Sequence, residues 1–135
     1  MSDCIFCRMI AGEIPSLRIH EDEDCIAVLD IGPAEKGHTL IIPKRHYADV
    51  TDGVSAEVLG KLMKTAAVIG ARQKERLHAD GFNIVQNNGE AAGQTVHHLH
   101  IHVIPRFQGG PVIAGWNPTD PGQEALREVY ELLKD

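Results

Sequence analysis

Short blocks of apolar residues separated by polar turns run through the first third of the chain and predict one helix followed by three strands. The turns carry residues that typically interrupt regular structure, among them Gly12 and the Gly32-Pro33 pair. The predicted elements are a helix over residues 5–11 and strands over residues 18–21, 25–30 and 39–42. Because the connections are short, we expect neighbouring strands to pair antiparallel.

The longest periodic segment follows Ser55, whose side chain suits the first position before a helix. Apolar residues recur there at helical spacing and predict one buried stripe. The stripe is expected to comprise Val58, Leu59, Leu62, Met63, Ala66 and Ile69. Lysine and arginine follow on the other face, which is typical of a solvated surface.

The second half of the chain predicts two more strands and a last helix. The strands are expected over residues 82–86 and 96–104, with Pro105 ending the second, and the helix is expected from Asp120-Pro121 onward. Residues 109–122 are rich in glycine and proline and predict irregular structure. They contain Trp116, for which packing and a contact with substrate are both open. The order of elements predicts an α+β fold.

Length and composition limit the classes of protein that fit. A chain of 135 residues, 43% hydrophobic and 24% charged, indicates a single globular domain over residues 1–135. No apolar run reaches the length of a membrane span. Three cysteines do not form a disulfide framework, so we expect a reducing compartment, the cytoplasm. A net charge of -6 argues against nucleic-acid binding but allows a small phosphate ligand in a local pocket.

Histidine is the informative residue type, with eight in the chain. His98, His100 and His102 alternate with Leu99 and Ile101, which is the period of a strand. On a strand the three imidazoles would share one face, about 7 Å apart, while the apolar residues face the core. Such a row suits either a metal ion or catalysis by imidazole itself, which is neutral near pH 7 and nucleophilic.

The tripeptide Gly93-Gln94-Thr95 directly precedes this segment and favours catalysis. Glycine allows a ligand to approach the backbone closely. Backbone N–H groups, together with the Gln94 and Thr95 side chains, suit the oxygens of a phosphate. The combination of a phosphate-binding loop and a histidine row therefore predicts chemistry at phosphorus.

Residues 93–106 resemble the signature of the histidine triad (HIT) family of nucleotide hydrolases and transferases. Three further segments resemble parts of the family: residues 4–15, 29–31 and 36–46. The first of them resembles the N-terminus of bacterial members of the family. The resemblance covers residues 3–107 and leaves 108–135 as a C-terminal extension. It implies a five-stranded antiparallel sheet with a long helix and short terminal helices, and a homodimer in which two sheets join.

The resemblance also implies roles for individual residues. His100 is the nucleophile that becomes covalently nucleotidylated, with His98 and His102 beside it and His102 contacting the phosphate. Substrate contacts are implied for Asp30, Ile31, His38, Asn87, Gly93, Gln94, Thr95, His100 and His102. His102, where the hexose-phosphate uridylyltransferase branch carries Gln, resembles the hydrolase branches.

These roles imply hydrolysis at the α-phosphorus of nucleoside phosphoramidates or dinucleoside polyphosphates, with release of AMP or another nucleoside monophosphate. The attacking ring nitrogen must be unprotonated, and we expect a backbone carbonyl to fix that tautomer. Two alternatives stay open. One is a metallohydrolase that uses the histidine row as ligands. The other is a nucleotide-binding scaffold dimer without turnover.

Cys4 and Cys7 have the spacing of half a zinc site. A redox pair or two small buried residues are the alternative interpretations. The resemblance to bacterial members implies that Cys4, Cys7, His46 and His98 hold zinc together. Four protein ligands leave no open position, so the zinc would be structural. No organic cofactor is expected, and Cys25 is expected in the core.

Overall fold

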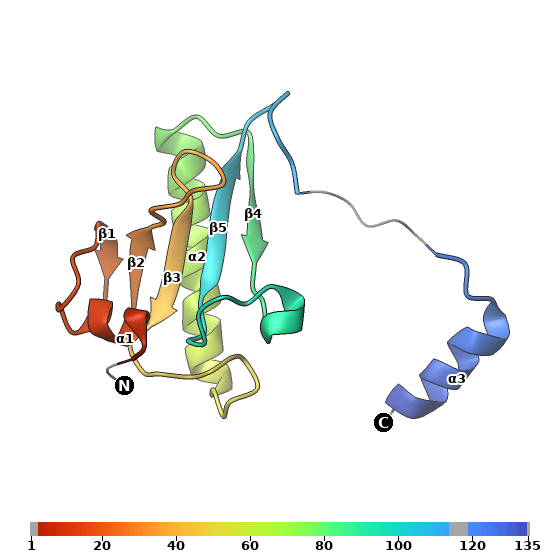
Figure 1. Ribbon diagram of the computed structural model, residues 1–135. Helices are drawn as coiled ribbons and strands as arrows, with labels where there is room; N and C mark the ends of the chain where they lie inside the picture. Colours follow the sequence, from red (N-terminus) through yellow and green to blue (C-terminus); the bar gives the residue numbers. More distant parts are fainter. Residues whose placement is uncertain (1–2, 114–118, 135) are drawn as a thin grey trace.

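The computed structural model describes residues 3–113 and 119–134 and shows one antiparallel sheet of five strands in the order β1-β2-β3-β5-β4. The long helix α2 packs along one face of the sheet, and the short helix α1 lies near the other (Figure 1). The elements are α1 Ile5–Ile10, β1 Arg18–Glu21, β2 Cys25–Leu29, β3 Thr39–Pro43, α2 Ala56–Arg76, β4 Gly81–Val85, the 3-10 helix η1 Glu90–Ala92, β5 Ile101–Arg106 and α3 Gln123–Leu133. The predicted α+β fold is confirmed.

The two faces of the sheet bury separate sets of side chains because successive residues of a strand point in opposite directions. In β2, Cys25 and Ala27 pack toward α2, whereas Ile26 and Val28 pack toward α1. Cys25 is 1% exposed, so the prediction that it belongs to the core is confirmed. The sheet thus has two hydrophobic clusters, and the face toward α1 is the one that forms the candidate site. None of the helices in the described residues combines the length and apolar character that a bilayer crossing requires.

Helix α2 begins where the sequence predicts, with the Ser55 hydroxyl accepting a hydrogen bond from the Val58 amide at 3.1 Å. Leu62, Ala66 and Ile69 form its buried stripe. The prediction for Met63 was wrong, because its side chain is 50% exposed. Successive side chains of an α-helix are about 100° apart around the helix axis. A helix lying on one face of a sheet therefore buries only a narrow stripe, and Met63 falls outside it.

The predicted strand over residues 96–104 was wrong in its start and its end, since β5 runs from Ile101 to Arg106. His98 and His100 therefore precede the strand. The backbone leaves the ladder there, because the Leu99 amide donates to the Tyr47 carbonyl at 2.7 Å. At the other end, β5 pairs with β3 only as far as Val103. Pro105 continues the strand against β4 alone, where its missing N–H costs no second ladder bond.

The C-terminal helix α3 forms, but it begins at Gln123 after Gly122 and not at residues 120–121. None of its residues is buried, and it lies apart from the sheet (Figure 1). Trp116 lies outside the described residues.

Candidate active site

A pocket of about 280 Å³ opens on the α1 side of the sheet. Apolar side chains from α1, β2 and the following loop form its walls, and Ile31 at its rim is fully exposed. The ionisable or hydroxyl side chains that line it include Asp30, Thr95, His100 and His102. The structure therefore brings together residues that are more than 60 positions apart in the sequence.

His100 is held in one tautomer. Its Nδ1 atom lies 2.7 Å from the backbone carbonyl oxygen of His98, and a carbonyl only accepts, so Nδ1 carries the proton. Burial lowers the pKa of His100 below its usual value, against opposing contributions from that carbonyl and from Asp30. The ring is therefore neutral near pH 7, and its Nε2 has a free lone pair. That nitrogen belongs to a side chain that lines the pocket.

His102 is oriented by His38. The Ala34 amide donates to Nδ1 of His38 at 2.9 Å, which leaves the proton of a neutral ring on Nε2. That Nε2 lies 3.0 Å from Nδ1 of His102 and 3.5 Å from a carboxylate oxygen of Asp30. His102 thus accepts at Nδ1 and carries its own proton on Nε2. Burial, together with the neighbouring His100 and His38, lowers the pKa of His102 to about 4.

Phe6 is a site residue that the sequence did not reveal. Its ring meets His100 edge-on at a centroid distance of 5.0 Å and His98 at 5.9 Å. It is 6% exposed and lines the pocket. Its place between Cys4 and Cys7 was the available signal, because a metal site that fixes the two cysteines also fixes the residue between them.

In the loop that is predicted to bind phosphate, the side chain of Gln94 is bonded to the backbone. Its Oε1 accepts from the Gly89 amide at 2.7 Å, and its Nε2 donates to the carbonyls of Ala48 at 2.7 Å and Val96 at 3.0 Å. These bonds commit the buried amide to the backbone, so it shapes the loop and does not contact a phosphate. Thr95, by contrast, is exposed at the pocket.

Asn87 and Gly93 lie next to each other in the same loop but do not line the pocket. Gly93 has a φ of 96°, in the left-handed region that favours glycine. Asp30 lines the pocket, and one of its carboxylate oxygens accepts from the Gly32 amide at 2.8 Å. Asp30 therefore holds the turn that carries Ile31.

Cys4, Cys7, His46 and His98 form a cluster whose ligand atoms all lie within 4.8 Å of one another. The two Nδ1 atoms are 3.1 Å apart, and the sulfur-to-nitrogen distances that fall within contact range are 3.3, 3.4 and 3.6 Å. Zinc bonded at 2.0–2.1 Å to nitrogen and 2.3 Å to sulfur gives tetrahedral edges of about 3.3 and 3.6 Å. The donor set and its spacing therefore fit a tetrahedral zinc ion.

The tautomer of His98 suits this cluster. Its Nε2 lies 2.9 Å from the carbonyl oxygen of Pro43 and donates to it, so Nδ1 presents a lone pair to the two sulfurs. His98 is fully buried. Its side chain belongs to the metal-binding cluster, while its backbone carbonyl orients His100.

The three histidines of the sequence motif therefore do not converge on one point. Of the groups in the described residues that could hold a metal, His98 belongs to the cysteine cluster and His102 to a group with Asp30 and His38. His100 belongs to neither. A third group contains His20, whose Nε2 lies 2.9 Å from a carboxylate oxygen of Asp22. This geometry does not favour a metallohydrolase that uses the histidine row as its ligands.

Residues 11–109 match the HIT domain family. The chain belongs to this family. A HIT-family sequence from Saccharomyces cerevisiae named adenosine 5′-monophosphoramidase HNT1 is 40% identical over 131 residues, which is 96% of this chain and 80% of that protein. The fold of this chain matches a solved structure from Streptococcus mutans UA159 with a TM-score of 0.90 at 39% identity. The match covers 99% of this chain and 85% of the other.

A second solved structure is relevant to the cysteine cluster because it is Zn-bound. A Zn-bound histidine triad family protein from Mycobacterium smegmatis matches with a TM-score of 0.79 at 40% identity, covering 98% of this chain and 96% of the other. Both solved structures confirm the HIT fold predicted from the sequence. They support the five-stranded antiparallel architecture described above.

Proposed function

We propose that this HIT protein hydrolyses nucleoside phosphoramidates or dinucleoside polyphosphates at the α-phosphorus, with His100 as the nucleophile. The observation that carries the proposal is the hydrogen bond from His100 Nδ1 to the His98 carbonyl, which leaves Nε2 unprotonated on a ring that lines the pocket. A neutral imidazole with a fixed tautomer is an effective nucleophile at neutral pH. The name of the yeast relative, a monophosphoramidase, supports a phosphoramidate as substrate.

The first step forms a bond between His100 Nε2 and the α-phosphorus and breaks the bond from phosphorus to the leaving nitrogen or oxygen. In the second step the oxygen of a water attacks phosphorus and the bond from phosphorus to His100 Nε2 breaks, which releases the nucleoside monophosphate. One water is consumed overall, its OH going to phosphorus and its remaining proton to the leaving group. His102 Nε2–H donates to a phosphoryl oxygen in both steps, and the Thr95 hydroxyl and loop amides add further donors.

The remaining substrate contacts follow from the pocket. Asp30 lies at the end of β2, where its carboxylate accepts hydrogen bonds from ribose hydroxyls, and Ile31 offers an exposed apolar surface to the base. Asn87 and Gly93 act in our proposal through the loop conformation. His38 supports the site by orienting His102.

Zinc in the proposal is structural and bound by Cys4, Cys7, His46 and His98, a set whose spacing fits the ion. A bound zinc would tie α1 to the segment that carries His100. No step of the reaction passes through it. A homodimer, a cytoplasmic location and a single domain over 1–135, with 108–135 as a C-terminal extension, remain predictions.

The deciding experiment is to react the protein with adenosine 5′-phosphoramidate, quench it rapidly in base, and search by mass spectrometry for AMP attached to His100. We expect His100→Ala to lower turnover by roughly three orders of magnitude or more, while AMP affinity stays within about tenfold. His97→Ala is the matched control, because His97 is an exposed histidine three residues before His100. Adenylylation at another residue, or turnover by His100→Ala within tenfold of wild type, would overturn the proposal.

A dinucleoside polyphosphate assayed beside the phosphoramidate decides between the two substrate classes. Both present the same α-phosphorus to His100, so the ratio of their kcat/KM values measures the preference for the leaving group. AMP binding without turnover of either compound would favour the scaffold alternative.

A further inference from the structure

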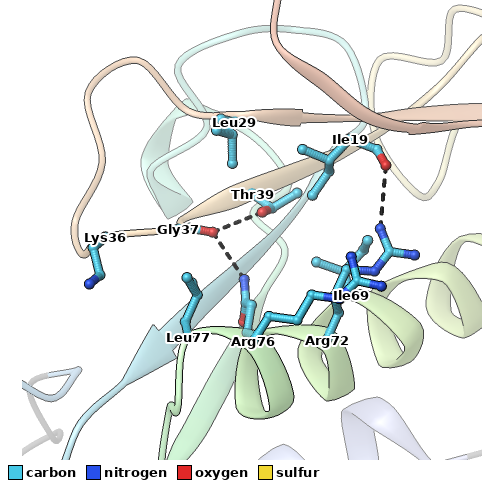
Figure 2. A pocket seen from close by; sticks show the side chains of 10 residues that line it. Ile19, Leu29, Lys36, Gly37, Thr39, Ile69, Arg72, Arg76 and Leu77 are labelled. Atoms are coloured by element: carbon cyan, nitrogen blue, oxygen red, sulfur yellow. Dashed lines mark hydrogen bonds between the residues drawn. The ribbon is translucent and has the colours of Figure 1, made fainter.

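A second pocket, of about 520 Å³, lies between the C-terminal half of α2 and the sheet (Figure 2). Its walls are largely apolar, with Ile19 of β1, Leu29 of β2, and Ile69 and Leu77 from the helix and its C-terminal end. Volume and lining are those of small-molecule sites, in which apolar walls surround a few polar groups. None of the groups assigned above to catalysis or zinc lines it.

The charged side chains that line this pocket are all cationic: Lys36, Arg72 and Arg76. No Asp or Glu lines it, although the chain has 19 acidic and 13 basic residues. The three cations form no ion pair with any residue in the described parts of the chain. Arg72 donates to the Ile19 carbonyl at 3.3 Å, which holds one guanidinium at the side of the pocket (Figure 2). Unpaired cations beside an apolar wall favour an anion.

Gln73 is a buried polar residue in the wall of this pocket. It lines the pocket and is 4% exposed. Its Nε2 donates to the carbonyls of Gly37 and Val103, both at 3.1 Å, so the amide orientation is fixed. Its Oε1 is buried and is the one such side-chain polar atom in the described residues that lacks a hydrogen-bond partner. Because this atom has almost no accessible surface, the Gln73 amide is a fixed, buried part of the pocket wall and not a ligand contact.

We infer that this pocket binds a small phosphomonoester that has an apolar body. Arg72 and Arg76 match the negative charge of a phosphate, since the guanidinium fork binds phosphate in a bidentate manner. The apolar walls match the body of the ligand, and Lys36 lies at the other end of the pocket (Figure 2).

The site has a defined relation to the catalytic pocket. Leu29 lines both pockets, and Gly37 and Thr39, which flank His38, line this one. The phosphomonoester site therefore lies behind the residue that orients His102.

The test is a titration with phenyl phosphate followed by amide NMR. We expect the amide signals of Gly37, Thr39 and Leu77 to move with a single saturable curve, and inorganic phosphate and benzyl alcohol to bind more weakly. Arg72→Gln/Arg76→Gln should weaken this binding on the order of tenfold or more. Lys64→Gln/Lys74→Gln is the control, because both lysines are exposed on the same helix and the change in charge is equal.

Arg76→Gln alone gives a second variant at an exposed position, so the test does not depend on the double variant folding. Shifts confined to Thr95 and its neighbours would overturn the inference, because they report the catalytic pocket. Equal binding by the wild type and Arg76→Gln, or a change of oligomeric state without a change in binding, would also overturn it. The readout does not involve turnover, so this outcome is independent of the proposed hydrolase activity.

Discussion

The backbone carbonyl oxygen of His98 lies 2.7 Å from Nδ1 of His100, while the side chain of His98 lies in the cysteine cluster, with its Nδ1 3.4 Å from the Cys4 sulfur. One residue thus joins two sites. The position of its backbone depends on where its side chain is held, and the tautomer of His100 depends on that backbone. Loss of metal from the cluster is therefore expected to affect both stability and the nucleophile.

His46→Ala is expected to lower zinc content, the melting temperature and turnover together, because it removes one of four ligands from the cluster. Metal analysis by mass spectrometry, differential scanning fluorimetry and a turnover assay would measure the three quantities. His20→Ala is the matched control, since His20 belongs to a separate group with Asp22. Full zinc content in His46→Ala would contradict the assignment of His46 as a ligand.

His38→Phe is expected to lower kcat roughly 10- to 100-fold with little change in AMP affinity, because it removes the N–H that fixes the tautomer of His102. Nitrogen NMR of the imidazole rings would show the His102 tautomer directly. His78→Phe, at an exposed position, should leave both kcat and that spectrum unchanged. A lower kcat with an unaltered His102 spectrum would mean that His38 acts by another route.

The pH dependence follows from the pKa of His102, which burial and two neighbouring histidines lower to about 4. The neutral ring donates from Nε2 and accepts at Nδ1. We expect this histidine to stay neutral from pH 8 down to about pH 5. The folded-state pKa lies below the unfolded value of 6.5, so the same group destabilises the fold progressively as pH falls from 6.5 to 4. Carbon-detected NMR titration of His102 would measure the midpoint, and a value near 6.5 would contradict this account.

Two glycines of α2 are expected to respond to alanine in opposite directions. A Cβ on Gly70 would lie 2.4 Å from ring atoms of Phe82, so Gly70→Ala should destabilise the protein by about 1–3 kcal/mol. A Cβ on Gly60 meets nothing within 4 Å, so Gly60→Ala should stabilise it by about 0.5–1 kcal/mol through helix propensity. Urea unfolding of both variants would test the pair. Equal shifts in the two urea midpoints would show that the Phe82 ring moves aside at little cost in stability.

Much of the fold was predictable because it rests on local patterns. Short blocks of apolar residues between polar turns predicted the strands, and the Ser55 cap with the stripe through Leu62 and Ala66 predicted α2. The errors occurred where tertiary contacts override periodicity. Residues 96–100 alternate like a strand, yet the backbone turns away because the Leu99 amide pairs with Tyr47, a residue from a different part of the chain. Met63 has helical spacing, yet the sheet covers only part of the helix.

The sequence by itself determined which residue types this protein brings to its site: a histidine row, a loop before it and two cysteines at metal-binding spacing. Only the tertiary structure decided how the work is divided among them. It places His98 in the cysteine cluster, His100 at the pocket and the Gln94 amide within its own loop. Residue types and short spacings are properties of the chain, whereas tautomers and hydrogen-bond partners depend on carbonyls that folding brings near. Pro43 and His98 supply those carbonyls, and no periodic pattern in the sequence marks them.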